Sequence, residues 1–356
     1  MFIKYCHIEN LYQADKLLEK VRREGLDSQD YAYGCFRKID GCNVQLSVGA
    51  DGTFSAASRN QEIPLGEGSP SFNGLEKVIK RCTLDEKVKL MKEKFAEIMG
   101  IKSLDFSFTV FGELYGGLYR HPDVPRDKEA ARIQGRIDYS PSNHWMAFDA
   151  VASSPDWEGP VWLSTNELEF LCHACGVQAQ IEDFTGTLDE CLAFSPEFID
   201  DTGHVLFGLP LVENNFAEGV VIKPHEYLEV GPLHERVIFK NKNPKYKERI
   251  RATKEKTKEA GAKLQPLEQE WLEKMCEFMN SARAMSAKSK LGSGASFSEI
   301  IEEATKDALQ EFQETYGEEF SRVQRENDPK DFSEKKITKA FAKFSIPFAR
   351  EAYLGK

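Results

Sequence analysis

The chain has 356 residues, of which 41% are hydrophobic and 29% are charged, and its formal net charge at pH 7 is −11. This length corresponds to one large or two ordinary domains, with enough apolar residues for a packed core. No apolar run approaches the roughly 18 residues of a membrane span, so we expect no membrane partner. The chain opens without an apolar signal region, and we expect a cytoplasmic location, which is the host cytoplasm if the protein is virus-encoded.

In chain order, the hydrophobic periodicity predicts a body of mixed helices and strands followed by helices alone. The predicted elements are a helix over 11–25, strands over 44–48 and 54–58 joined by a turn at Asp51-Gly52, a loop over 61–73, a helix over 75–99 with a break near Cys82-Thr83, a strand over 106–110, a charged loop over 118–138, a strand over 145–149, a helix over 165–176, strands over 219–222 and 237–242, and helices over 264–279, 296–316 and 331–355.

The hydrophobic period changes from two to 3.6 after Lys245. Ser296 and Glu299, and again Asp331 and Glu334, have the spacing of a capping box that opens a helix. We therefore predict three segments, which are a domain over 1–248, a basic linker over 249–262 and a small all-helical domain over 263–356.

Charge is distributed unevenly along the chain. Residues 1–236 hold 23 Lys/Arg and 38 Asp/Glu, whereas residues 237–356 hold 24 and 20. The basic excess is densest from Lys240 to Lys263, with ten basic and three acidic residues. This pattern suits a polyanionic partner at one edge of an acidic protein, and it equally suits a solvated helix face.

The eight cysteines show no spacing of a disulfide framework. Cys172 and Cys175 form a single C-x-x-C, without the second pair of a zinc site. Because their segment has helical composition, we interpret them as core thiols and expect a reducing compartment.

The stretch from Lys38 to Asn43, Lys-Ile-Asp-Gly-Cys-Asn, presents a lysine just before a predicted strand. By itself it is an ordinary surface turn or a candidate catalytic lysine. Five further short elements follow it. In order they are Ser58-Arg59, Phe111-Gly112-Glu113, Phe148-Asp149, Glu218-Gly219 and Lys240-x-Lys242.

This ordered set resembles the nucleotidyltransferase superfamily of ATP-dependent DNA ligases, RNA ligases and mRNA capping enzymes. Within it the chain is most similar to the RNA ligase 2 family, the nick-sealing RNA ligases of bacteriophages and of kinetoplastid RNA editing. The similarity covers roughly residues 1–248. Its further matches are Met1-Phe2-x-Lys4-Tyr5 with Ile8-Glu9-Asn10, Tyr139-Ser140-Pro141, and Lys223-Pro224 after Glu218-Gly219-x-Val221.

The resemblance implies an α+β fold, the nucleotidyltransferase fold of ATP-grasp-like ligase adenylation enzymes, with antiparallel sheets flanked by helices and a helical C-terminal domain. It implies an ATP-dependent RNA ligase that uses Mg²⁺ or Mn²⁺ and joins 3′-hydroxyl and 5′-phosphate RNA ends at nicks in duplex RNA. The implied intermediates are a lysyl-AMP and an RNA-adenylate, and we expect a monomer.

The resemblance also implies a role for individual residues. Lys38 would be the nucleophile, and Lys240 and Lys242 would approach the α-phosphate and neutralise its charge. Glu218 would hold the divalent cation. The implied nucleotide-binding residues are Glu113 at the ribose, Phe148 stacked on adenine, Asp149 beside it, Arg59 at a phosphate or the nick ends, Asn43 in the later steps, and Asp40 and Lys223.

The chain departs from the family pattern at two positions. Arg37 precedes the lysine where the RNA ligase 2 family has a glutamate that reads adenine. Asp40 stands where the phage enzyme has histidine, although aspartate is usual in the wider superfamily.

Two other functions remain open at this point. A DNA ligase or capping guanylyltransferase would follow the lysine pair with a barrel of short strands, whereas residues 262–356 have helical periodicity. A non-catalytic nucleic-acid-binding relative would be expected to lose the lysine or the metal carboxylate first, and both are present.

Overall fold

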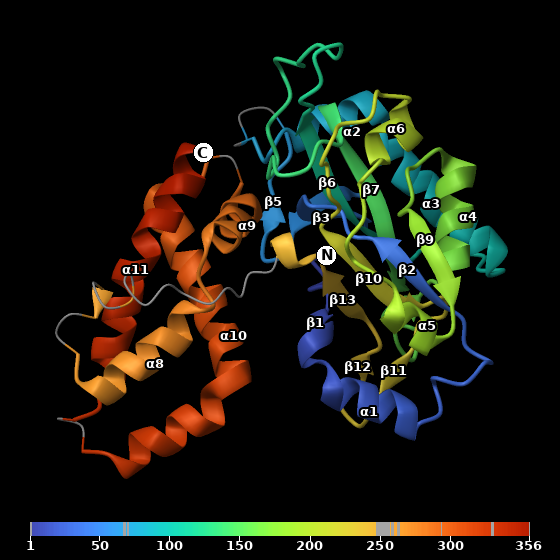
Figure 1. Ribbon diagram of the computed structural model, residues 1–356. Coiled ribbons are helices and arrows are strands. Elements are labelled where there is room, and N and C mark those ends of the chain that lie inside the picture. The colour runs from blue at the N-terminus through green and yellow to red at the C-terminus, as the bar shows by residue number, and fades with distance from the viewer. Residues whose placement is uncertain are drawn as a thin grey trace. The chain divides into compact units, whose positions relative to one another are not determined.

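The computed structural model describes residues 2–66, 69, 71–246, 257, 260–261, 264–292, 294–328 and 331–355. The chain divides into two compact units, Met1–Lys245 and Tyr246–Lys356 (Figure 1). Residue 248, the predicted end of the first domain, and most of the predicted linker 249–262 lie outside the described residues.

Six strands of the first unit form an antiparallel sheet in the order β5-β4-β3-β6-β7-β8. They are β3 (Cys42–Val48), β4 (Phe54–Ser58), β5 (Glu62–Ile63), β6 (Ser107–Leu118), β7 (Ser140–Ser153) and β8 (Val161–Trp162). The predicted turn at Asp51-Gly52 is confirmed, because β3 pairs with β4 and Gly52 has a φ of +79°. The predicted strands in β6 and β7 are too short, because the pairing continues through a bulge at Phe111/Gly112.

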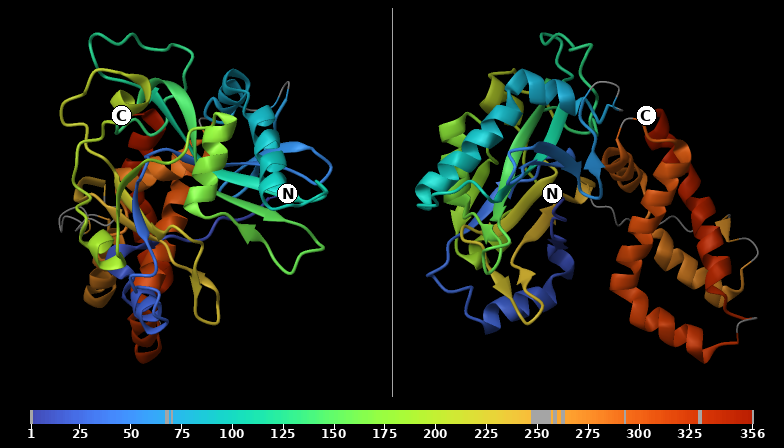
Figure 2. Two further views of the ribbon diagram at one scale, coloured as in Figure 1. Left: turned by 90° about the vertical axis from the view of Figure 1, so that its right-hand side faces the viewer. Right: turned by 180° about the vertical axis from the view of Figure 1, so that it is seen from behind.

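Three helices cover one face of this sheet, α2 (Leu75–Cys82), α3 (Leu84–Ile98) and α4 (Thr165–Cys175), as Figure 2 shows. Val44, Leu46 and Val110 alternate toward them and form a core with their apolar residues. The break in the predicted helix 75–99 is confirmed at Thr83, whose φ of +47° separates α2 from α3. Cys172 and Cys175 lie buried in this core, and all eight cysteines are free thiols.

A second sheet of the first unit has five strands in the order β1-β13-β10-β2-β9. They are β1 (Glu9–Asn10), β2 (Tyr33–Arg37), β9 (Glu182–Gly186), β10 (Gly219–Pro224) and β13 (Phe239–Lys242). Only the β1–β13 pair is parallel among the described strands. Helix α1 (Asp15–Arg23), preceded by the 3₁₀ turn η1 (Leu11–Gln13), and helix α5 (Leu188–Ala193) cover it, with α1 contributing Leu17 and Val21.

The remaining described elements of the first unit are short. They are helix α6 (Thr202–Phe207), the ribbon of β11 (Glu229–Val230) and β12 (Glu235–Arg236), and the turn η2 (Pro244–Tyr246), whose last residue belongs to the second unit. The expected α+β class, with antiparallel sheets flanked by helices, is confirmed.

The described part of the second unit contains only helices. They are α8 (Pro266–Cys276), α9 (Ser281–Leu291), α10 (Phe297–Glu326) and α11 (Glu334–Leu354). Trp271, Phe312 and Phe320 lie at the centre of its core. The long helices α10 and α11 pack against each other.

Two predictions on these helices were wrong. The capping box at Ser296 and Glu299 is confirmed, but α10 continues past Tyr316 to Glu326, because Phe320 supplies a further core contact. Helix α11 is not capped by Asp331; its N-cap is Ser333, and the Ser333 backbone N–H donates to the buried Glu268 carboxylate at 3.0 Å. Within the described residues, no helix is long and apolar enough to cross a membrane.

Candidate active site

Lys38 lies directly after the last residue of β2, and its backbone joins the neighbouring strand. The Lys38 N–H donates to the Gly219 carbonyl at 3.0 Å, at the start of β10. Lys38 Nζ lies 2.7 Å from Oε2 of Glu218. Because Gly219 pairs with Lys242 in the β10–β13 register, Lys242 also reaches this carboxylate, with Nζ 3.1 Å from Oε1.

Glu218 is therefore a buried carboxylate with a lysine at each oxygen. Burial alone would raise the pKa of this carboxyl, but the charges of Lys38, Lys242 and Arg136 outweigh burial and lower the pKa to about 2. Glu218 is thus a fixed anion at neutral pH.

Lys240 precedes Lys242 by two residues on β13 and pairs with Val221. Side chains two apart on a strand share one face of the sheet. The predicted lysine pair is therefore presented on the face that holds Glu218.

Asp40 and Glu113 complete the surroundings of Lys38. The Asp40 backbone N–H donates to the Tyr139 hydroxyl at 2.8 Å, and its buried carboxylate pairs with Arg136. Burial is the main cause that raises the pKa of Glu113 to about 8, with Glu218 and Asp40 adding to it and Lys38 opposing it. Burial thus favours the protonated form of the Glu113 carboxyl in this cluster.

Two predicted residues pair across the six-stranded sheet, since Asn43 on β3 pairs with Glu113 on β6. Strand alternation turns both side chains away from the core under α2, α3 and α4. Arg59 directly follows β4, whose last residue, Ser58, pairs with Val44.

Phe148, Asp149 and Lys223 form a second group. Lys223 Nζ donates to the Phe148 carbonyl at 2.8 Å. Burial lowers the pKa of the Lys223 ammonium to about 8, and Arg236 lowers it further against the opposing charge of Asp149. The Phe148 ring is part-buried and meets the Tyr5 ring edge-on at 5.3 Å.

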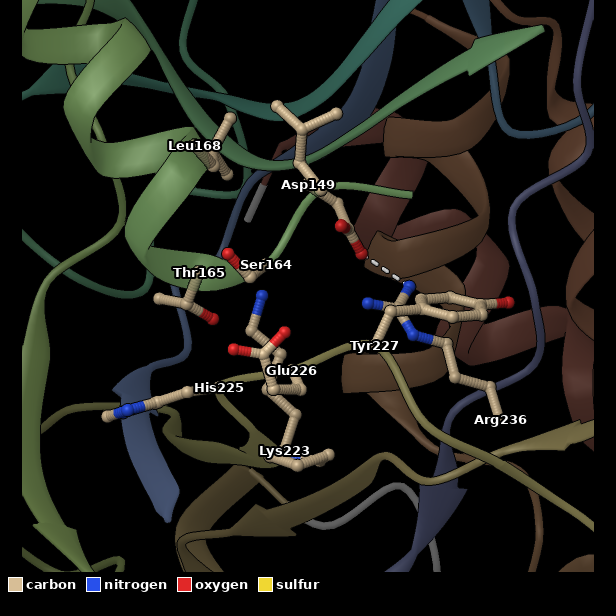
Figure 3. Close-up of a pocket in the computed structure, with 11 residues that line it drawn as sticks. Asp149, Ser164, Thr165, Leu168, Lys223, His225, Glu226, Tyr227 and Arg236 are labelled. Carbon is tan, nitrogen blue, oxygen red and sulfur yellow. Dashed lines mark ion pairs between the residues drawn. The ribbon is translucent and has the colours of Figure 1, made fainter. Parts of the chain in front are cut away.

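A small pocket lies beside this second group (Figure 3). Asp149 and Lys223 line it, and Arg236 pairs with the Asp149 carboxylate across it, as the dashed line marks. Tyr5 donates to the same carboxylate at 2.7 Å, and the Arg236 guanidinium lies over the Tyr227 ring at 4.8 Å. The Asp149 carboxylate is thus bound by both Tyr5 and Arg236.

Arg37, the residue at which the sequence departs from the family pattern, has a buried side chain that forms two ion pairs. Its Nη2 lies 2.5 Å from Asp183 on β9, and its Nη1 lies 2.5 Å from Asp201, which precedes α6. The Thr202 hydroxyl accepts a further hydrogen bond at 3.1 Å. The Arg37 side chain therefore joins β2 to β9 and α6.

Three residues of these clusters were not predicted from the sequence. Arg136 lies in a charged loop without periodicity, and Arg236 lies just before a predicted strand, so neither carried a signal. Tyr5 could have been found, because it belongs to the opening motif that resembles the family.

The site offers few protein ligands to a metal. Among the described residues, no group of three or more His, Cys, Asp or Glu side chains is arranged around a common point. A single buried carboxylate such as Glu218 suits Mg²⁺, which keeps several waters and binds through one or two carboxylates together with substrate phosphates.

The family model described as RNA ligase matches residues 35–242, which is more than half of the chain and spans β2 to β13. The chain therefore belongs to the RNA ligase family, within the nucleotidyltransferase superfamily.

Two curated relatives are the mitochondrial RNA-editing ligases 1 and 2 of Trypanosoma brucei brucei. The first is 28% identical over 239 residues, covering 61% of this chain and 49% of that protein. The second is 26% identical over 240 residues, covering 63% and 55%. The chain thus spans about half the length of the curated relatives it matches.

Solved structures of a Naegleria gruberi RNA ligase are also similar. A mutant with ATP and Mn has a TM-score of 0.43 at 14% identity, covering 69% of this chain and 58% of that chain. Another mutant, with AMP and Mn, has a TM-score of 0.42 at 12% identity, covering 69% and 57%.

Proposed function

We propose that this chain is an ATP-dependent RNA ligase that joins 3′-hydroxyl and 5′-phosphate ends at nicks in duplex RNA. Membership of the RNA ligase family supports the class of reaction. The observation that carries the proposal is the buried Glu218 carboxylate between Lys38 and Lys242. A lysine held beside a second cation is one of the arrangements that activate an amine nucleophile.

In the first step Lys38 attacks the α-phosphorus of ATP. A P–N bond forms, the bond to pyrophosphate breaks, and the amine loses a proton to solvent. The attack needs the neutral amine, whereas a free lysine has a pKa of about 10.4 and is mainly protonated at pH 7. Lys240 and Lys242 neutralise the charge that develops on the α-phosphate.

The nucleotide is held by the two residue groups around Lys38 and Lys223. Phe148 stacks on adenine, with Asp149 and Lys223 supporting the base site from behind. Glu113 accepts a hydrogen bond from the ribose and ionises as the nucleotide binds. Arg59 binds a phosphate or the nick ends, Asn43 acts in the later steps, and Asp40 supports the Lys38 turn.

Glu218 is the residue that would hold a divalent cation, Mg²⁺ or Mn²⁺. Bound there with the phosphates, the cation supplies charge neutralisation. Lys38 Nζ donates to the same carboxylate.

Two further transfers complete the reaction. An RNA 5′-phosphate oxygen attacks the α-phosphorus, the P–N bond breaks, and Lys38 is regenerated. A 3′-hydroxyl then attacks the 5′-phosphate, forming the phosphodiester bond and releasing AMP. RNA is the partner, and the protein acts as a monomer. Residues 1–248 carry out adenylyl transfer, and residues 263–356 assist in binding RNA.

The test is incubation with α-labelled ATP and Mg²⁺, followed by denaturing electrophoresis. We expect a covalent label on the wild-type protein and none on Lys38→Ala. Labelling from GTP but not from ATP would favour a capping guanylyltransferase and overturn the proposal. Sealing of nicked RNA, DNA and hybrid duplexes, compared side by side, then separates an RNA ligase from a DNA ligase.

A further inference from the structure

Arg136 makes a two-point contact with Asp40, two residues after Lys38. Its Nε lies 2.9 Å from Oδ2 of Asp40, and its Nη2 donates to Oδ1. The Asp40 carboxylate is buried, and the Arg136 side chain is 17% exposed. A planar guanidinium that meets both oxygens of a carboxylate fixes its orientation as well as its charge.

Arg136 belongs to a short segment that holds the Lys38 turn at several points. Gln134 Nε2 donates to the Gly41 carbonyl at 3.2 Å, and the Tyr139 hydroxyl accepts from the Asp40 N–H at 2.8 Å. On the other side of the turn, the Lys38 N–H donates to Gly219. The turn is thereby fixed between the loop before β7 and the start of β10.

The pairing matters because Asp40 competes with Glu218 for cations. Lys38 acts electrostatically on both carboxylates, and Arg136 also acts on both. A buried carboxylate that loses its cation is strongly destabilised and takes up a proton or another cation. Lys38 is a cation besides Arg136 that acts on Asp40, so it would shift toward Asp40. Such a shift would draw the nucleophile away from Glu218 and Lys242.

We propose that Arg136 is a positioning residue of the adenylyl transfer, which holds the Asp40 carboxylate so that Lys38 stays aligned with Glu218 and Lys242. The inference rests on the proposed function, because it concerns the same lysine and the same first step. The 118–138 loop thereby has a role in adenylyl transfer, although Arg136 belongs to none of the family motifs.

The test measures single-turnover self-adenylation of Arg136→Ala under saturating ATP and Mg²⁺. Misplacement of a reacting group by 1 Å costs about 100-fold, so we expect a rate loss of about that size. Added guanidinium chloride at tens of millimolar restores the rate severalfold, whereas sodium and methylammonium chloride at equal ionic strength do not. This rescue is a response that loss of folding would not give.

The matched control is Arg22→Ala. Arg22 on α1 also pairs with an aspartate, with Nη2 3.0 Å from Oδ1 of Asp189, but both side chains are more than half exposed. It should keep the wild-type rate within about twofold and show no guanidinium effect, since a solvent-exposed pair contributes little.

The outcomes separate the two proposals. If wild-type protein takes no label, the proposed function fails and this inference fails with it. If wild type labels and Arg136→Ala labels at the same rate, or loses rate without selective guanidinium rescue, only the positioning role is overturned. Where Arg136→Ala does not fold by circular dichroism, Arg136→Lys decides: we expect a lower rate at an unchanged half-saturating ATP concentration, and a wild-type rate overturns the role.

Discussion

At the scale of single residues, Glu218 is the charge on which the Lys38 site depends. Its two oxygens hold two ammonium groups, and its lowered pKa shows that they stabilise the anion more than burial disfavours it. The depressed pKa adds stability above the pKa of an unfolded glutamate, near ~4.3, and this stability is lost as the pH falls toward 2.

We predict that Glu218→Gln loses self-adenylation by about 100-fold or more, because the amide removes the negative charge that both lysines contact and offers a weaker metal ligand. Labelling is measured across a Mg²⁺ titration. Glu158→Gln, which changes an exposed carboxylate, is the control and should behave as wild type. Full activity of the Glu218 variant would contradict its role.

Glu113 gives a pH dependence of opposite sign. Its folded pKa, raised to about 8, exceeds that of an unfolded glutamate, so its protonated form stabilises the folded protein at low pH. This stability is lost as the pH rises from about 4.3 to 8, by up to about 1.4 kcal/mol per pH unit. Glu113→Gln should therefore show a smaller fall in melting temperature between pH 5.5 and 8 than wild type, measured with a chelator present. Parallel curves for the two proteins would argue against the raised pKa.

At the scale of elements, β10 and β13 approach each other closely where the site residues meet. Gly219 has a φ of +134°, and a Cβ there would lie 2.1 Å from the Asn241 carbonyl oxygen. Only glycine permits the strand to start at this point, directly after Glu218.

Gly219→Ala should lower the free energy of unfolding by about 2–4 kcal/mol, because it combines backbone strain with a clash against backbone that cannot move away. Urea unfolding measures the change. Gly159→Ala is the control, because its Cβ would meet open space. Equal midpoints for the two variants would show that the strand tolerates a side chain at Gly219.

At the scale of the whole molecule, the net charge and the type of secondary structure change in the same region of the sequence. Residues 1–236 are strongly acidic, whereas residues 237–356 have a net charge of +4. The described part of the second unit is helical and has its own core. We propose that this unit acts on RNA and not on ATP.

Ending the chain after residue 250 should leave self-adenylation within about twofold of the full chain while weakening nick sealing. The loss of cationic contacts should also reduce the salt dependence of RNA binding, since each neutralised phosphate contributes to that slope. Sealing of a nicked RNA duplex between 50 and 200 mM KCl is the measurement, with self-adenylation as the internal control. A truncated protein that seals as well as the full chain would refute the proposed division of labour.

Much of the fold could be predicted from sequence because its signals are local. The turn at Asp51-Gly52, the break at Thr83 and the capping box at Ser296 each depend on a few neighbouring residues. The order of short motifs also indicated the family and named Lys38, Glu218 and Lys242 as one site. Where a helix depended on distant packing, as at the end of α10, the prediction was wrong.

The partners of the charged residues were decided only by the tertiary structure. Arg136 binds Asp40, 96 residues away, and Arg37 binds Asp183, 146 residues away. Such pairs depend on strand register and on the path of a loop in space, and the hydrophobic periodicity of the sequence indicates neither. The sequence by itself predicted which residues would carry the chemistry, whereas the folded chain decided which charges face them, because ion pairing depends on distance in space and not on distance along the chain.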